Sequence, residues 1–190
     1  MSTLYVYRAD ATGSLEDPIR NGAQISTVLG AIGVRFERWS ANRSLETGAT
    51  QDAILAVYAD EVAALRRECG YQSADVVRIP RGTPDTAPMR AKFLSEHIHV
   101  EDEVRFFVEG SGSFYLHVDG QVFHVVCEQN DLISVPARTR HWFDMGTAPQ
   151  FCAIRLFSNP TGWVAEFTGD PLATRFPTHD DALAHLAKPA

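Results

Sequence analysis

The alternation of hydrophobic and polar residues changes character near residue 80 of the chain. From about His97 onward, short runs rich in Val, Ile and Phe read as strands, and turn residues separate them. Asp119-Gly120 is a strong hairpin signal, because both residues tolerate positive φ. The expected strands are Val104–Val108, Ser113–Val118, Gln121–Cys127, Leu132–Val135 and Ala153–Phe157, with a turn at Glu109–Gly112. Short strands joined by tight turns predict a β-barrel or jelly roll.

The first 80 residues have a mixed pattern. Helical spacing of apolar residues predicts a helix from Gln51 to Cys69, and Gly70 stands where a C-terminal cap belongs. The other expected elements are strands at Thr3–Tyr7, Val34–Trp39 and Val76–Ile79, a helix at Gly22–Leu29 and a loop at Pro80–Pro88. A short terminal helix, Asp180–Ala187, is expected within a polar tail.

These elements together predict a mainly β fold with flanking helices, of the α+β class. A length of 190 residues suits a single domain. We expect a mixed α/β part over about residues 1–80, a barrel core over about 89–170 and a polar tail over about 171–190.

Composition excludes several classes of function. The 17 basic and 24 acidic residues give a net charge of −7, which works against binding a phosphate backbone. No apolar run is long enough to span a bilayer, and no secretory signal is visible at the N-terminus. Three cysteines without CxxC spacing favour a reducing compartment, so we expect a cytoplasmic protein, and a monomer in the absence of any feature that demands a partner chain.

The segment from His97 to Arg105 carries the chemistry. Residues two apart on a strand point to the same face, so His97 and His99 can offer their imidazoles to one point. Glu103 opens the next strand and can approach the same point, and His141 follows a turn at the start of a later strand-like run. We therefore predict that these four side chains bind one metal ion.

Three neutral imidazoles and one carboxylate suit Fe(II), Ni(II), Mn(II) or Zn(II). Four protein ligands on an octahedral ion leave two neighbouring positions for a small oxygen-donor substrate. The remaining histidines are expected to have other roles. His117 and His124 lie within the strand pattern and favour buried hydrogen bonding, whereas His179 and His185 in the tail are expected to be solvated.

The quoted residues carry a resemblance to known proteins. HIHVEDEVRFFVEG resembles the first cupin motif, and the segment from Pro136 to His141 resembles the second, although Ala91, Arg138 and Met145 depart from it at turns. The runs KFLSEHIHVEDEVRFFVEGSGSFYLHV, NDLISVPARTRHWFDMG and IRLFSNPTGWVAEFTG closely resemble acireductone dioxygenases. The resemblance is strong from about Met89 to Arg175 and implies a cupin-type barrel.

The resemblance also implies a function. Acireductone dioxygenases act in methionine salvage on the enediol 1,2-dihydroxy-3-keto-5-methylthiopentene, with O2 as co-substrate. With Fe(II) they give formate and 4-methylthio-2-oxobutanoate, and with Ni(II) they give formate, CO and 3-methylthiopropanoate. One Fe(II) or Ni(II) ion per chain is expected, and the sequence leaves the choice open.

Several residues beside the predicted ligands become candidates for roles in catalysis. Arg105 lies two residues beyond Glu103 on the same strand face and could donate hydrogen bonds to substrate oxygens, or else form a surface ion pair. The resemblance assigns Phe93, Phe143 and Trp163 to the substrate pocket, and plain core packing is the alternative for these aromatic residues. It also places Glu96 and Asp102 near the site, where either could orient an imidazole, take a substrate proton or be a solvated turn residue. The alternatives are another metal-dependent cupin enzyme and a non-catalytic cupin that binds a small molecule.

Overall fold

The computed structural model describes residues 1–11, 17–159 and 164–187. Its strands are β1 Thr3–Arg8, β2 Arg35–Arg38, β3 Ser73–Ile79, β4 His97–Ile98, β5 Glu103–Val118, β6 Gln121–Glu128, β7 Asp131–Val135, β8 Arg140–Asp144, β9 Phe151–Phe157 and β10 Glu166–Phe167. Its helices are α1 Gly22–Gly30, α2 Gln51–Val57, α3 Ala59–Cys69, α4 Ala87–Phe93, the 3-10 helix η1 Pro171–Arg175 and α5 His179–Leu186.

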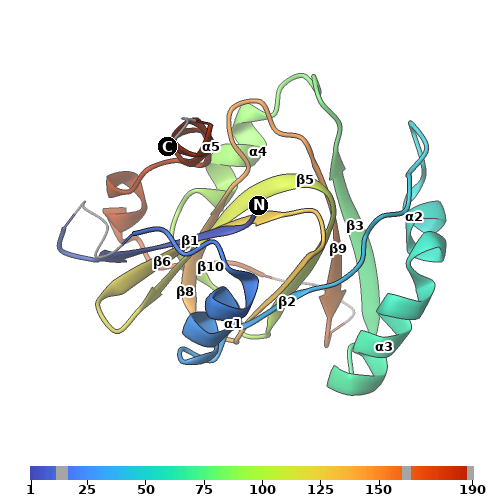
Figure 1. Ribbon diagram of the computed structural model, residues 1–190, viewed down its shortest axis with the longest axis horizontal. Coiled ribbons are helices and arrows are strands. Elements are labelled where there is room, and N and C mark those ends of the chain that lie inside the picture. Colours follow the sequence, from blue (N-terminus) through green and yellow to red (C-terminus); the bar gives the residue numbers. More distant parts are fainter. Residues whose placement is uncertain (12–16, 160–163, 188–190) are drawn as a thin grey trace.

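Strand β5 organises the antiparallel barrel, because it belongs to both of its halves (Figure 1). Its first part pairs with β7 and β9, and its second part pairs with β6 and β8. The two halves therefore run β1-β6-β5-β8-β4-β10 and β2-β7-β5-β9-β3. The prediction of a mainly β barrel with flanking helices is confirmed.

The turn expected at Glu109–Gly112 is wrong, since β5 continues through this segment with a shift of register. Gly110 has a φ of 66°, and a Cβ at this position would lie 1.8 Å from the carbonyl oxygen of Gln150. Only glycine fits both the positive φ and this close approach. A residue that resembles a turn signal in the sequence instead lies where β5 passes from β9 to β6, shortly after the irregularity between Phe107 and Glu109.

The N-terminal strands belong to the barrel sheets. β1 pairs with β6, β2 with β7 and β3 with β9. The single helix expected from Gln51 to Cys69 is divided at Tyr58, whose buried hydroxyl lies 3.3 Å from the carbonyl oxygen of Ala41. Gly70 caps α3 with a φ of 75°, as predicted. Helix α4 begins at Ala87, so only its first two residues fall within the loop expected at Pro80–Pro88, and the rest of the helix was not predicted.

The C-terminal segment packs on the barrel although its sequence predicts a polar tail. Leu172, Phe176 and Ala182 are buried in a cluster with Trp142. The expectation that His179 is solvated is wrong: its side chain is buried and binds two serine hydroxyls. His185 is exposed, as expected.

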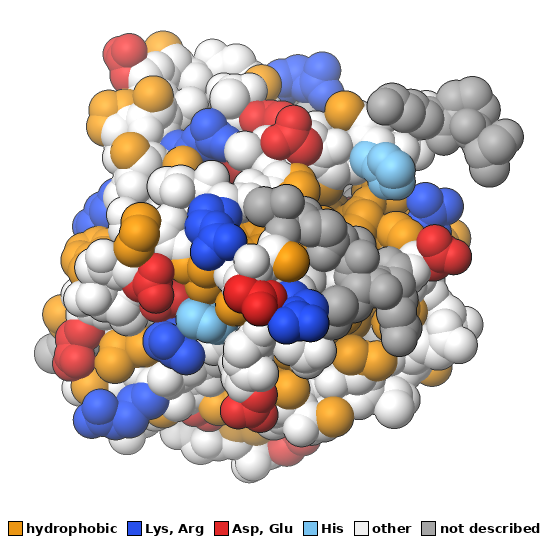
Figure 2. Space-filling view, turned by 90° about the vertical axis from the view of Figure 1, so that its left-hand side faces the viewer, with side chains coloured by type: hydrophobic (Ala, Val, Ile, Leu, Met, Phe, Trp, Pro, Cys, Tyr) orange, Lys and Arg blue, Asp and Glu red, His pale blue; other side chains and the backbone are white. Residues whose placement is uncertain are grey.

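The outer surface of the described residues carries mixed charges. Figure 2 shows basic and acidic side chains interspersed over one face of the molecule. None of the described helices combines the length and apolar character needed to cross a bilayer.

Candidate metal centre

The four predicted ligands meet inside the barrel. His97 on β4 pairs directly with His141 on β8, and Glu103 begins the neighbouring strand β5. All four side chains, including that of His99, are buried. One donor atom from each lies within 4.8 Å of the others. Alternation along β4 and its continuation thus aims two imidazoles inward, as the HxH spacing predicts.

Backbone carbonyls hold the three imidazoles in one orientation. Nδ1 of His97 lies 2.7 Å from the Ser95 oxygen, and Nδ1 of His141 lies 2.7 Å from the Thr139 oxygen. Nδ1 of His99 lies 2.9 Å from the Val164 oxygen. A carbonyl can only accept, so each Nδ1 carries a proton, and a neutral ring then presents its Nε2 lone pair.

The converging Nε2 atoms meet the Glu103 carboxylate. Glu103 Oε2 lies 2.8 Å from Nε2 of His141 and 3.3 Å from Nε2 of His99. Neighbouring donors on a transition-metal ion lie about 3 Å apart, since each bond is about 2 Å long. The two separations from Glu103 fit neighbouring positions on a single ion, and the three-nitrogen, one-oxygen donor set suits a divalent transition metal.

The charges of the cluster follow from its burial. Burial lowers the pKa of His97 to about 4, and the neighbouring His141 adds to this shift. Burial raises the pKa of Glu103, but Arg105 and the imidazoles outweigh it and hold this pKa well below its usual value. Burial also opposes a charge on His99, yet its contact with Glu103 raises its pKa above the usual value. The cluster thus holds an ionised carboxylate beside a neutral His97 imidazole, the forms in which these groups bind metals.

Arg105 is buried next to the four ligands. Its Nη2 lies 2.7 Å from Glu103 Oε1, and its guanidinium carbon lies 4.4 Å from the ring centre of Phe143 and 5.1 Å from that of Phe114. Burial lowers the pKa of Arg105 and Glu103 opposes this shift, so the guanidinium keeps its charge. The alternative of a surface ion pair does not fit a side chain that is 5% exposed.

Comparison with known proteins decides the family. The ARD/ARD' family model matches residues 3–165. The chain belongs to this family. An acireductone dioxygenase of Parvibaculum lavamentivorans is 56% identical over 177 residues, which cover 93% of this chain and 96% of that protein. Its counterpart in Pseudomonas aeruginosa strain UCBPP-PA14 is 52% identical over 181 residues, covering 95% of this chain and 100% of that one.

A solved structure agrees with the sequence comparisons. It is an acireductone dioxygenase from Bacillus anthracis with a cadmium ion in its active centre. The TM-score is 0.76 at 32% identity, and the match covers 88% of this chain and 98% of the other. The identification of the family and of its cupin fold is therefore confirmed.

In this member of the ARD/ARD' family, a cavity of about 160 Å³ opens onto the ligands. Two of the predicted pocket residues, Phe93 and Phe143, line it together with Arg105. The third, Trp163, lies outside the described residues. Sequence reasoning missed four lining residues, Lys92, Arg155, Ala165 and Phe167. Two of them had a local signal, since Lys92 precedes Phe93 and Ala165 lies two residues beyond Trp163.

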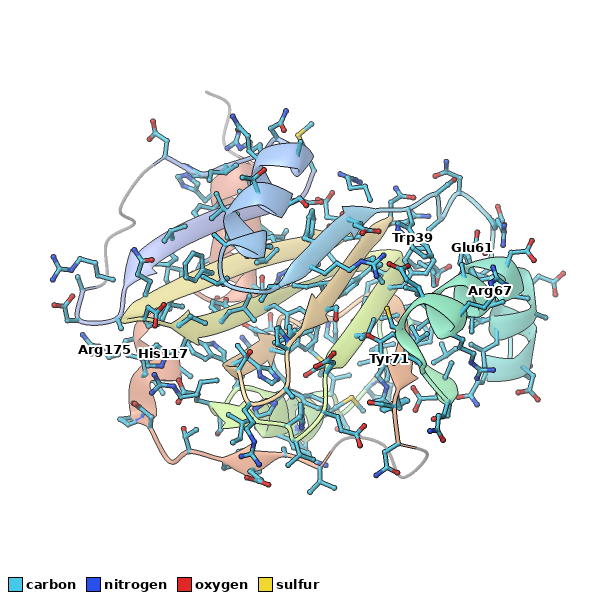
Figure 3. All side chains as sticks on the ribbon, turned by 90° about the horizontal axis from the view of Figure 1, so that it is seen from below. Trp39, Glu61, Arg67, Tyr71, His117 and Arg175 are labelled. Atoms are coloured by element: carbon cyan, nitrogen blue, oxygen red, sulfur yellow. The ribbon has the colours of Figure 1, made fainter. Side chains whose placement is uncertain are left out.

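The two candidate carboxylates occupy different environments. Glu96 is buried, with Oε2 at 2.7 Å from Nδ1 of His117 and Oε1 accepting a hydrogen bond of 2.8 Å from Thr168. Asp102 is exposed, and its Oδ1 accepts a hydrogen bond of 2.9 Å from the Ala137 amide. Figure 3 shows His117 at the end of the molecule opposite Glu61 and Arg67 of α3.

Buried hydrogen bonding of the two strand histidines is confirmed. His117 binds Glu96 as described, and Nε2 of His124 lies 2.9 Å from the hydroxyl of Ser113. Both imidazoles are buried.

Proposed function

We propose that this chain is an acireductone dioxygenase, which cleaves 1,2-dihydroxy-3-keto-5-methylthiopentene with O2 in methionine salvage. The observation that carries the proposal is a convergent set of three imidazoles and one carboxylate, at a cavity that also holds a buried guanidinium and aromatic rings. The enediolate has two adjacent oxygens at one end and an apolar methylthio group at the other. When bound to the four donors, a divalent ion supplies Lewis-acid chemistry and a template for those oxygens.

Arg105 is our candidate for the group that binds the charged end of the substrate. Its contacts with Glu103 and the aromatic rings hold the guanidinium in place before substrate arrives. A fixed, desolvated cation donates stronger hydrogen bonds to an anionic oxygen than a mobile surface cation does. This supports a role in binding and polarising the enediolate.

Phe93, Phe143 and Trp163 are proposed to enclose the methylthio end. The first two line the cavity. Apolar walls favour an apolar tail and exclude water, which protects a substrate that oxidises spontaneously. For Glu96 and Asp102 the proposed roles are orienting an imidazole as a hydrogen-bond acceptor or accepting a substrate proton, and the alternative is a residue without a role in the site.

The ion is proposed to be Fe(II) or Ni(II), one per chain. The expected products are formate and 4-methylthio-2-oxobutanoate with iron, and formate, CO and 3-methylthiopropanoate with nickel. The test is elemental analysis of protein purified without added metal, followed by O2 uptake with the enediol and measurement of CO. Metal binding with no O2 uptake after loading with either ion would instead indicate another cupin enzyme or a binding protein.

We also propose that the protein is cytoplasmic and monomeric. All three cysteines are unpaired, with Cys127 and Cys152 buried and Cys69 exposed, which suits a reducing compartment. Light scattering of the purified protein tests the oligomeric state.

A further inference from the structure

Helix α4 forms one wall of the cavity but has little apolar anchorage. It contributes Lys92 and Phe93 to the lining, yet none of its seven residues is fully buried. The residue at its N-cap, Thr86, makes no side-chain capping hydrogen bond. A helix this short gains little stability from its own hydrogen bonds. Its position must therefore come from contacts with the rest of the molecule.

The main polar contact is a two-point ion pair between α4 and β8. Nε and Nη2 of Arg90 lie 2.7 Å and 2.9 Å from the two carboxylate oxygens of Asp144. Arg90 is 18% exposed and Asp144 is 1% exposed, so water screens the pair only weakly. Burial raises the pKa of Asp144, but Arg90 and two backbone amides lower it below its usual value, and the carboxylate stays charged.

Both partners of this ion pair are close in sequence to the cavity walls. Arg90 is three residues before Phe93 on the same helix, and Asp144 directly follows Phe143 on β8. Neither Arg90 nor Asp144 lines the cavity described above, whereas both phenylalanines do. The ion pair therefore fixes the distance between Phe93 and Phe143, and neither of its partners reaches the cavity between these two rings.

We infer that the Arg90–Asp144 ion pair positions Phe93 against Phe143 and thereby determines how tightly the site binds the apolar end of its substrate. The inference rests on the proposed function for the identity of that substrate. Arg90 and Asp144 are positioning residues, because they act through the two aromatic walls.

The C-terminal segment contacts both partners of this ion pair. The backbone N–H of His179, the first residue of α5, donates a hydrogen bond of 2.9 Å to Asp144 Oδ2, and Asp180 lies 3.9 Å from Arg90. Figure 1 shows α4 and α5 next to each other at one end of the molecule. Residues beyond 165 lie outside the family match, yet they support the carboxylate that holds the cavity wall.

The chain offers a closely matched control pair. Arg78 on β3 binds Glu109 on β5 through the same two nitrogens, at 3.1 Å and 3.2 Å, and Arg78 is 17% exposed. Neither residue lines the cavity. An Arg78→Gln variant therefore loses a two-point ion pair whose arginine is equally exposed, although its carboxylate is more exposed (33% for Glu109, 1% for Asp144), at a place where substrate binding should not respond.

The experiment compares Arg90→Gln, Arg90→Lys, Asp144→Asn and Arg78→Gln in metal-loaded protein. The substrates are the methylthio enediol and a shortened enediol with a methyl group in place of the methylthioethyl tail. For Arg90→Gln and Asp144→Asn we expect KM for the long substrate to rise about tenfold, as for a loosened apolar pocket, with kcat and metal content close to wild type. The shortened enediol should show little change, Arg90→Lys an intermediate effect, and Arg78→Gln wild-type values.

Two results would overturn the inference: equal KM values for Arg90→Gln and Arg78→Gln, or an equal rise for both substrates. If Arg90→Gln does not fold, Arg90→Lys decides the question, since it keeps the charge but loses the fork geometry. A wild-type protein that binds metal but consumes neither enediol would instead reject the proposed function, so the two failures are distinguishable.

Discussion

The barrel holds two buried clusters of histidines that behave differently. The ligand cluster contains His97, His99, Glu103 and His141. The Ser–His cluster contains Ser111, Ser113, His124 and His179, with Ser113 Oγ at 2.9 Å from Nε2 of His124 and 2.8 Å from Nδ1 of His179. The histidines of both clusters are buried, so neither burial nor the presence of histidine distinguishes a metal site from a hydrogen-bonded cluster.

What separates the clusters is the partner of each ring nitrogen. In the ligand cluster, carbonyl oxygens take the Nδ1 protons, and the Nε2 lone pairs converge on a carboxylate. In the Ser–His cluster, a hydroxyl lies between the two rings, and both nitrogens of His179 bind serine oxygens. Hydroxyls can donate or accept, so Ser113 can bridge the two rings without an ion. A metal site therefore requires oriented, unshared lone pairs and a negative charge, which histidine content alone does not supply.

The largest expected effect is the loss of Glu103. Glu103→Gln keeps the shape but removes the only carboxylate among the four ligands, and it leaves the buried Arg105 without its charge partner. We expect metal binding and O2 uptake to be abolished or severely weakened, and the same for His97→Ala. Elemental analysis of the purified variants measures this. His124→Gln is the control from the Ser–His cluster and should retain its metal; if it lost the metal as well, the distinction between the clusters would be wrong.

A second variant separates ion binding from substrate binding within the ligand cluster. Arg105→Gln should leave the metal content near wild type, since Arg105 offers no ligand atom. Turnover should fall by roughly 10²–10³, the usual cost of removing one fixed donor that stabilises negative charge. Metal analysis with kcat measurements on loaded protein checks both expectations. A fully active Arg105→Gln variant would show that the guanidinium does not serve the substrate.

The ligand cluster could be predicted from sequence because most of it is local. His97, His99 and Glu103 lie within seven residues, and the two-residue period of a strand determines which side chains share a face. The barrel strands were also predictable from alternation. The continuation of β5 through Gly110 was not, because a glycine within a strand that changes partners and a glycine in a turn look alike until those partners are known.

Other features depend on pairings that no local pattern carries. Arg90 and Asp144 are 54 positions apart, and Ser113 and His179 are 66 apart. Helix α4 follows a proline-rich stretch without apolar periodicity, so its position comes from tertiary contacts. The C-terminal segment is polar by composition, yet Leu172, Phe176 and Ala182 are buried in one cluster with Trp142.

A smaller effect is expected at Glu96, which lies on the opposite side of β4 from the ligand imidazoles. Glu96→Gln weakens the contact with His117, which is not a ligand, and Glu96 directly precedes the ligand His97, so we expect the affinity for the metal to fall by about tenfold at most. Turnover of the fully loaded variant should stay near wild type. Asp102→Asn is the exposed control. A collapse of kcat with metal intact, in either variant, would assign that carboxylate to proton transfer instead.

The smallest effect at neutral pH is expected in the Ser–His cluster, where a difference in stability should emerge only as the pH falls. Burial lowers the pKa of His124 to about 3, and the neighbouring His179 adds to the shift. Between about pH 6.5 and pH 3 the unfolded chain therefore binds a proton that the folded chain does not, so stability falls as pH falls, by up to about 1.4 kcal/mol per pH unit.

Denaturant unfolding from pH 7 to pH 4 should give a shallower decline for His124→Gln than for wild type. His185→Gln removes an exposed histidine and should follow wild type. Asp131, whose pKa burial raises to about 6, contributes in the opposite direction, but it is common to all three proteins and cancels in the comparison. Equal slopes for the two variants would mean that His124 is protonated in the folded state, and the Ser–His cluster would then be no neutral counterpart to the ligand cluster.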